Sequence, residues 1–417
     1  MPCNVHFLPA KAGDCIVLEL DNNDCILIDG GYTSTYKQEL KPLLLRLRDK
    51  GCRIVLMIVT HIDQDHIEGA VRLLSENGTK DNPQIIPIEN IWFNGFFNTL
   101  ATLPQFVGRQ IEALSPNIRD QKKRILRDIQ MQLPGEDGSI SAQHSKCFEE
   151  LCAENGYSLN RQFPNAIVLC ASKTRKEVLQ NGIQFGACKI YVLGPTESQL
   201  NCLAKELEMS LVKLFGCDYQ LGEGFGKFFE DLMKLSQKPQ PETQEIAALG
   251  MQLESWIGTS TMSPMNTVNC ASIVVEIEYK GISMLFTGDS ESDIWANLLA
   301  PHYQLIKLSH HGTTKPNLAL LENTTGERLL ISTNGGNNHR HPEGELLARA
   351  ILKNNRSLYF NYRIAHQEQL LKLQEKYGFN PIFEEKEIRQ RIDRRRRVIL
   401  YSTGFYLRIY AWTQKVL

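Results

Sequence analysis

Residues 54–66 read Ile-Val-Leu-Met-Ile-Val-Thr-His-Ile-Asp-Gln-Asp-His, and this stretch decides the fold class. The apolar run 54–59 is typical of a strand buried on both faces. Four side chains that can bind a metal follow within six residues: His61, Asp63, Asp65 and His66. Two imidazoles and two carboxylates at this density suit zinc, manganese or iron. The simpler alternative is a polar loop that caps a helix, with Asp65 at the helix N-terminus.

The sequence before this stretch predicts strands and one helix. Residues 5–10, 15–20 and 25–31 are strand-like runs, and Asp21-Asn22-Asn23-Asp24 supplies a hairpin turn between the last two. Leucines at helical spacing predict a helix over about residues 36–50. A strand, a helix and a further strand in this order begin an α/β unit.

Two strand-rich halves enclose mostly helical sequence. Strand-like pieces return at 166–172 and 189–195, and strands resume from residue 271. We therefore expect a single domain over residues 1–417, with a core of 1–96 and 264–417. Helical insertions are expected at about 97–160 and 197–262.

Three further segments place polar side chains after apolar strands. Leu-Phe-Thr-Gly-Asp ends on Asp289, Leu-Ser-His-His-Gly holds His310 and His311, and a later turn holds His339 and His341. Together with His61 and His66, the four histidines of these segments make six of the ten in the chain. Because sites in open α/β sheets form at the carboxyl ends of strands, we expect these side chains to meet at one edge.

Together these motifs resemble the metallo-β-lactamase superfamily. They are Ile-Leu-Ile-Asp-Gly-Gly (26–31), Thr-His-Ile-Asp-Gln-Asp-His (60–66), Phe-Thr-Gly-Asp (286–289), Ser-His-His-Gly (309–312) and His-Pro (341–342). The nearest branch is that of the DNA-uptake protein ComEC and the bacterial phosphorylcholine esterases, which carry His-x-Asp-x-Asp-His and an Asn-x-x-Ser, supplied here by Asn269 to Ser272. The resemblance covers about 1–95 and 264–345 and implies an α+β fold, an αββα sandwich with its site along one edge.

The resemblance also implies two divalent metal ions, zinc or manganese. It assigns His61 and Asp63 to one ion, Asp65, His66 and either His310 or His311 to the other, and Asp289 to a position between them. The spacing does not separate His310 from His311; we favour His311 as the ligand and His310 as the residue facing substrate. Asn269 stands where the wider superfamily has a third histidine, so one site has fewer strong ligands.

The remaining candidates surround these ligands. Asp29 is expected to hydrogen-bond a ligand and orient it. The catalytic candidates are Asp65, His310 and His341, and the residues expected behind the ligands or at the substrate are Asp29, Asn269, His339 and Asn334. Because Asp63 and Asp65 are expected to hold metal, proton donation to a leaving oxygen falls to His310 or His341.

These residues predict a metal-dependent hydrolase, a phosphodiesterase or nuclease that uses a metal-bridging hydroxide. Its substrate would contain a phosphodiester, with nucleic acid as one candidate. The alternative is a partner-dependent subunit of a larger system, such as a bacterial antiviral defence system, with a protein partner at the helical insertions and gated or no intrinsic activity. Asp63 and Asn269, standing where histidines are usual, disfavour a β-lactamase or thioesterase.

Composition excludes several other classes. Among 417 residues, 46 Lys and Arg face 47 Asp and Glu, so the net charge of −1 argues against a protein that coats a polyanion. Eleven cysteines without a Cys-x-x-Cys pair disfavour a zinc–thiolate site or a disulfide framework. No apolar run reaches the roughly 20 residues of a membrane helix and the N-terminus lacks a signal pattern, so we expect a cytoplasmic protein with no membrane partner.

Six arginines lie close together in residues 389–397. They permit two interpretations: a contact to a phosphate backbone, or a solvated loop neutralised by the acidic stretch before it. The second interpretation assigns the arginines no function.

Overall fold

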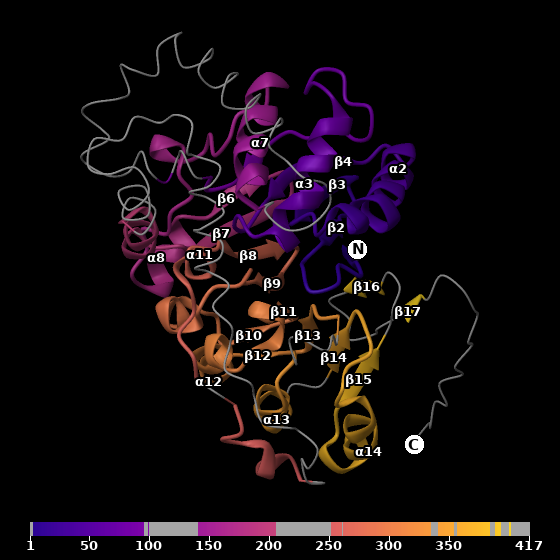
Figure 1. Cartoon of the computed structure of the whole chain (residues 1–417), viewed down its shortest axis with the longest axis vertical. Coiled ribbons are helices and arrows are strands. Elements are labelled where there is room, and N and C mark those ends of the chain that lie inside the picture. Colours follow the sequence, from indigo (N-terminus) through magenta and orange to yellow (C-terminus); the bar gives the residue numbers. More distant parts are fainter. Residues whose placement is uncertain are drawn as a thin grey trace, which may run out of the picture.

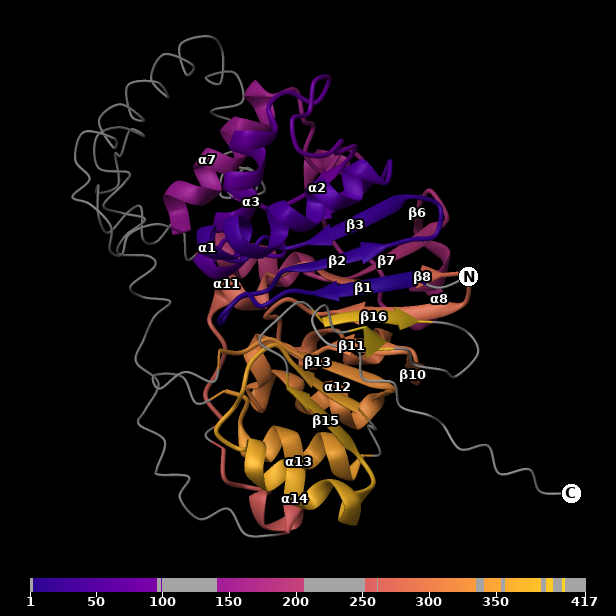
Figure 2. The same cartoon turned by 90° about the vertical axis from the view of Figure 1, so that its right-hand side faces the viewer.

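A computed structural model of the chain describes residues 3–95, 99, 141–205, 252–260, 262–334, 341–353, 357–383, 388–392 and 400–401. Two β-sheets pack face to face, and helices cover their outer faces (Figure 1). The view in Figure 2 shows the layers in order, with α2, α3 and α7 above the first sheet and α13 and α14 below the second.

The first sheet contains β4, the strand that precedes the candidate ligands His61 to His66. Within the described residues it has seven strands in the order β17-β16-β1-β2-β3-β4-β5. The bounds are β1 Cys3–Phe7, β2 Ile16–Glu19, β3 Asp24–Ile28, β4 Arg53–Ile58, β5 Ile91–Trp92, β16 Ile388–Ile392 and β17 Leu400–Tyr401. Strands β3, β4 and β5 run parallel, whereas β2–β3 is the hairpin expected from the turn at 21–24.

The second sheet has eight strands within the described residues, in the order β15-β14-β13-β11-β9-β8-β7-β6. Its bounds are β6 Ile183–Phe185, β7 Cys188–Gly194, β8 Val274–Tyr279, β9 Ile282–Phe286, β11 Leu305–Lys307, β13 Arg328–Ile331, β14 Ser357–Phe360 and β15 Asn380–Phe383. A small parallel pair joins β10 (His302–Tyr303) to β12 (Thr325–Gly326). Strands β6 and β7 belong to this sheet although they lie outside the core ranges expected from sequence.

The helices are α1 Thr33–Thr35, α2 Lys41–Asp49, α3 Gln64–Asn77, α7 Ser141–Glu154, α8 Arg175–Gln180, α11 Thr267–Cys270, α12 Leu318–Asn323, α13 Gly344–Leu352 and α14 Gln367–Tyr377, and residues 197–205 are also helical. A π-helical turn, Tyr36–Leu40, joins α1 to α2, so the expected helix over 36–50 begins three residues earlier, at Thr33. No helix among the described residues is both long and apolar enough to cross a membrane.

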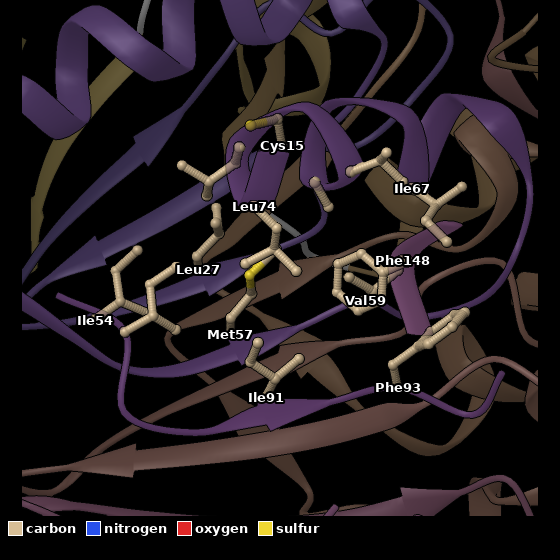
Figure 3. Close-up of a cluster of buried hydrophobic side chains, with 14 of the residues drawn as sticks. Cys15, Leu27, Ile54, Met57, Val59, Ile67, Leu74, Ile91, Phe93 and Phe148 are labelled. Atoms are coloured by element: carbon tan, nitrogen blue, oxygen red, sulfur yellow. The ribbon is translucent and has the colours of Figure 1, made fainter. Parts of the chain in front are cut away.

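Alternation along the strands produces three apolar layers. Val5, Phe7 and Ile26 point between the sheets, whereas Val17 and Leu27 point toward the helices. The outer layer of the first sheet contains Leu74 of α3 and Phe148 of α7, packed against strand residues such as Met57 (Figure 3). Burying each such side chain stabilises the fold by roughly 1.5–3 kcal/mol.

Two expectations of secondary structure need correction. Residues 166–172 form no strand, because Val168 pairs with the Asn94 side chain through both its N–H and its C=O, at 2.9 and 2.8 Å, instead of joining a strand ladder. Residues 388–392, which hold Arg389 and Arg391, form β16, which pairs antiparallel with β1, so the interpretation as a solvated loop is wrong for these two arginines. Arg394 to Arg397 lie outside the described residues.

Candidate metal centre

The candidate ligands gather where strands of both sheets end. His61 lies three residues after the end of β4, and Asp29 directly follows β3. Asp289 and the His310–His311 pair follow β9 and β11 of the other sheet. Since these strand ends meet at one edge of the sandwich, two halves of the chain contribute to a single cluster.

The loop between β4 and α3 presents its carboxylates to the cluster instead of capping the helix. Asp63 occupies the N-cap position of α3, yet its side chain makes no capping hydrogen bond. One Asp63 carboxylate oxygen, Oδ2, lies 3.5 Å from Nε2 of His61. An N-cap aspartate ordinarily stabilises a helix by capping it; here the Asp63 carboxylate faces an imidazole instead. Asp65 lies in the first turn of α3, where the alternative interpretation placed it.

His66 is held by hydrogen bonds behind its ring. Its Nδ1 lies 2.8 Å from Oδ2 of Asp29, and Asp29 in turn accepts hydrogen bonds from the backbone N–H and the hydroxyl of Thr60, at 2.7 and 2.8 Å. Nε2 of His66 therefore points away from Asp29 and lies 3.5 Å from Oδ2 of Asp289. A carboxylate behind an imidazole fixes the tautomer of a metal-ligating histidine in this way.

The second sheet supplies Asp289, His310 and His311. Nε2 of His311 lies 3.3 Å from Asp289 and 3.4 Å from Asp65. His310 turns the other way, since its Nδ1 lies 3.0 Å from Asp289 and 3.2 Å from the Asn269 amide nitrogen. His311 therefore faces the carboxylate contributed by the first sheet, whereas His310 lies beside Asn269.

Several buried atoms of this cluster lack a hydrogen-bond partner. They are Nε2 of His61 and of His66, Nδ1 of His311, and one oxygen each of Asp63, Asn269 and Asp289. Buried polar atoms are ordinarily satisfied, so a set of orphans at one place needs an explanation. His61, His66 and Asp289 bring ligand atoms within 4.8 Å of one another, and so do Asp65, His66 and His311. These donors fit a divalent cation.

The charges of the cluster are strongly coupled. Burial opposes ionisation of Asp65, yet His66 and His311 lower its pKa to about 2. Burial likewise disfavours the charged form of His311, but Asp289 and Asp65 raise its pKa to about 9. The pKa of His66 is raised well above its usual range despite burial, by the same two carboxylates and Asp29. A dense group of carboxylates thus attracts positive charge, whether protons or metal ions.

The remaining candidates lie around this centre. The buried His341 has its Nδ1 3.4 Å from the hydroxyl of Thr313, and its ring centroid lies 5.9 Å from that of His310. Asn334 is exposed after β13. His339 lies outside the described residues.

Part of the chain matches a known family. Residues 8–82 match the family model of the metallo-beta-lactamase superfamily. The two sheets with helices on their outer faces form an α+β sandwich of the αββα type that the sequence motifs predict. No curated protein matches the chain.

Two solved structures align over most of the chain. The metallo-beta-lactamase fold protein YhfI from Bacillus subtilis has 8% identity and a TM-score of 0.35, and the alignment covers 94% of this chain and 100% of that one. A mutant of the CmlA beta-hydroxylase has 9% identity and a TM-score of 0.34, with coverage of 94% and 53%.

Two buried residues beside the cluster were not identified from the sequence. Asp14 lies before β2, and Lys307 is the last residue of β11. Both are buried, and the Lys307 ammonium group pairs with Oδ2 of Asp14 directly behind the cluster. The sequence did carry an indication of this pair, because a lysine inside the apolar run Leu305–Leu308 requires a buried partner of opposite charge.

Proposed function

We propose that this protein is a metal-dependent phosphodiesterase with a two-ion centre built from both sheets. The observation that carries the proposal is the convergence of imidazole and carboxylate groups whose buried Nε2 and oxygen atoms have no hydrogen-bond partner. His61 and Asp63 would hold one ion, Asp65, His66 and His311 the other, and Asp289 would lie between them. Asp29 would orient His66 through their 2.8 Å hydrogen bond.

The charge of the cluster supports bound cations. Five carboxylates converge here, those of Asp14, Asp29, Asp63, Asp65 and Asp289, and the buried ammonium group of Lys307 offsets one of them. Without metal, the neighbouring carboxylates favour protons on His66 and His311, whose pKa values they raise. Divalent cations would supply positive charge at the same carboxylates in place of those protons.

The donor set favours phosphoryl chemistry. Divalent ions, when bound, make hydroxide available near neutral pH and stabilise negative charge that develops on a phosphoryl oxygen. Asp63 replaces an imidazole by a harder oxygen donor, which favours manganese relative to zinc. The same His-x-Asp-x-Asp-His spacing supports placing the chain near ComEC and the phosphorylcholine esterases.

His310 is suited to proton transfer. Its side chain is 18% exposed, more than that of His311, so a bound substrate can reach it. Nδ1 of His310 contacts Asp289 and Asn269, and these contacts hold the orientation of the His310 ring. We assign His310 the role of proton donor to the leaving oxygen, with His341 beside it facing substrate.

Hydrolysis of bis-p-nitrophenyl phosphate with added manganese or zinc tests this function. We expect metal-dependent turnover by the wild type and none above background by the Asp65→Ala/His66→Ala double variant. Asp49→Asn, a change at an exposed carboxylate of α2, serves as the matched control and should leave turnover unchanged. Wild-type protein that cleaves neither this ester nor single- or double-stranded nucleic acid beyond the double variant refutes the proposal.

A further inference from the structure

A buried ion pair lies directly behind the candidate metal centre. Lys307 of β11 is 1% exposed and Asp14 is 2% exposed, and their side chains are in direct contact. The Lys307 ammonium group also donates a hydrogen bond to the carbonyl oxygen of Gly288, at 3.2 Å, and lies 3.7 Å from Oδ1 of Asp289. Lys307 therefore holds the turn from which the second sheet presents Asp289.

Asp14 is tied to the ligands of the first sheet. Its backbone N–H donates to the carbonyl oxygen of Asp65, at 3.3 Å, and its Oδ2 lies 3.9 Å from Nδ1 of His66. The preceding Gly13 packs against Asp65 so closely that a Cβ at this position would overlap the Asp65 carbonyl group. The loop carrying Asp14 is thus fitted onto the loop carrying Asp65 and His66.

The position of this ammonium group resembles that of a bound cation. Asp14, Asp29 and His66 bring three ligand atoms within 4.8 Å of one another, all of them buried. Lys307 already supplies a positive charge to Asp14, and His66 turns its Nδ1 toward Asp29. A third metal ion at Asp14, Asp29 and His66 would have to displace the Lys307 ammonium group from Asp14. These residues therefore bind Lys307 and not a metal ion.

We propose that Asp14 and Lys307 form a positioning pair that sets the ligands of one sheet against those of the other. This inference rests on the proposed metal function, because its consequence is the geometry of the centre. Asp14 fixes the loop of Asp65 and His66, Lys307 fixes the turn of Asp289, and their contact aligns the two. The ion proposed for Asp65, His66 and His311 would take ligands from both sides of the sandwich, so its affinity depends on that alignment.

Cobalt titration of the metal-free protein tests the pair, because Co²⁺ reports both affinity and ligand geometry through its visible spectrum. The variants are Lys307→Met, Asp14→Asn and the double variant. We expect each single variant to weaken Co²⁺ binding by about tenfold or more, the range for residues that orient metal ligands, and to alter the visible spectrum. Because the two residues act together, the double variant should lose less affinity than the product of the two single losses.

A second lysine–aspartate pair offers a matched control. Lys280, between β8 and β9, pairs with Asp21, between β2 and β3, at 2.6 Å, so it also joins the two sheets. It lies at the other end of β9 from Asp289, and Lys280 is 45% exposed. Lys280→Met should leave the affinity and spectrum of bound Co²⁺ unchanged.

The outcomes separate this inference from the function it rests on. Wild-type binding that persists within twofold in Lys307→Met and Asp14→Asn, with the same spectrum, overturns the positioning role and leaves the proposed function intact. A wild type that binds no Co²⁺ overturns both. If Lys307→Met fails to fold by circular dichroism, the isosteric Asp14→Asn variant decides, with the same two readouts.

Discussion

The two adjacent histidines show how backbone conformation assigns different roles to identical side chains. His310 and His311 both adopt the left-handed region, with φ of 46° and 55°. Such values are uncommon outside glycine and cost of order 1–3 kcal/mol for each residue. This turn directs His311 to Asp65 and His310 to Asn269, and no spacing rule in the sequence predicts it.

The first prediction separates these two histidines. His311→Ala should weaken metal binding by more than the roughly 10–100-fold typical of a residue that only orients a ligand. His310→Ala should retain metal and lower kcat by about 10²–10⁴, the range for a general acid. Metal content and steady-state kinetics of both variants decide this. Equal metal loss in the two variants would contradict the assignment.

A second residue-scale prediction concerns His366, which is buried against Trp256 at a ring distance of 5.5 Å. Burial lowers its pKa below the usual 6.5. The unfolded chain therefore binds more protons below about pH 6.5, so His366 makes the protein less stable as the pH falls through that value.

Urea unfolding at pH 7.5 and pH 5 measures this effect. The wild type should lose more stability between these values than His366→Phe, which keeps an aromatic ring without the titrating group. Identical pH dependence in the wild type and His366→Phe would show that His366 contributes nothing.

At the scale of elements, helix α3 places two ligands by packing unusually close to the end of β3. The N–H of Gly30 donates to the carbonyl oxygen of His66 at 2.8 Å, and the N–H of Gly69 donates to that of Gly31 at 2.7 Å. A Cβ at Gly69 would overlap the backbone of Gly30. The missing side chain at Gly69 therefore lets the first turn of α3 reach Asp29.

The prediction for this contact is that Gly69→Ala destabilises the protein by about 1–3 kcal/mol, the usual cost of overpacking. It should also weaken metal binding, because α3 must move away from the turn after β3. Denaturant unfolding and metal titration measure the two effects. Arg72→Ala on the exposed side of the same helix controls for the loss of helix contacts, and a Gly69→Ala variant as stable as wild type would refute the close packing.

Elements were predictable where a pattern was strong and local. The leucines at 40, 43, 44 and 47 are buried as their spacing indicates, and the apolar strands before His61 and His310 are present. The apolar residues 167–172 resemble a strand, but a buried extended segment need not pair with another strand. Here the Asn94 side chain satisfies the backbone N–H and C=O of Val168. Strand β16 was missed because arginines at alternate positions do not read as an apolar strand.

At the scale of the whole molecule, neither sheet holds the complete site. The loop and helix α3 that follow β4 of the first sheet carry four of the candidate residues, His61, Asp63, Asp65 and His66. The turns after β9 and β11 of the second sheet carry the other three, Asp289, His310 and His311. The sequence predicted this set because each residue follows an apolar strand. It did not reveal Asp14 and Lys307, since their pairing joins positions almost 300 residues apart and depends on how the two sheets pack.

The central claim is a two-ion centre, and metal analysis of the protein purified without chelators tests it most directly. We expect close to two divalent ions per chain in the wild type and a clear loss in Asp289→Asn, whose side chain lies between the two groups of candidate ligands. Wild-type protein that carries no more metal than Asp289→Asn would contradict it.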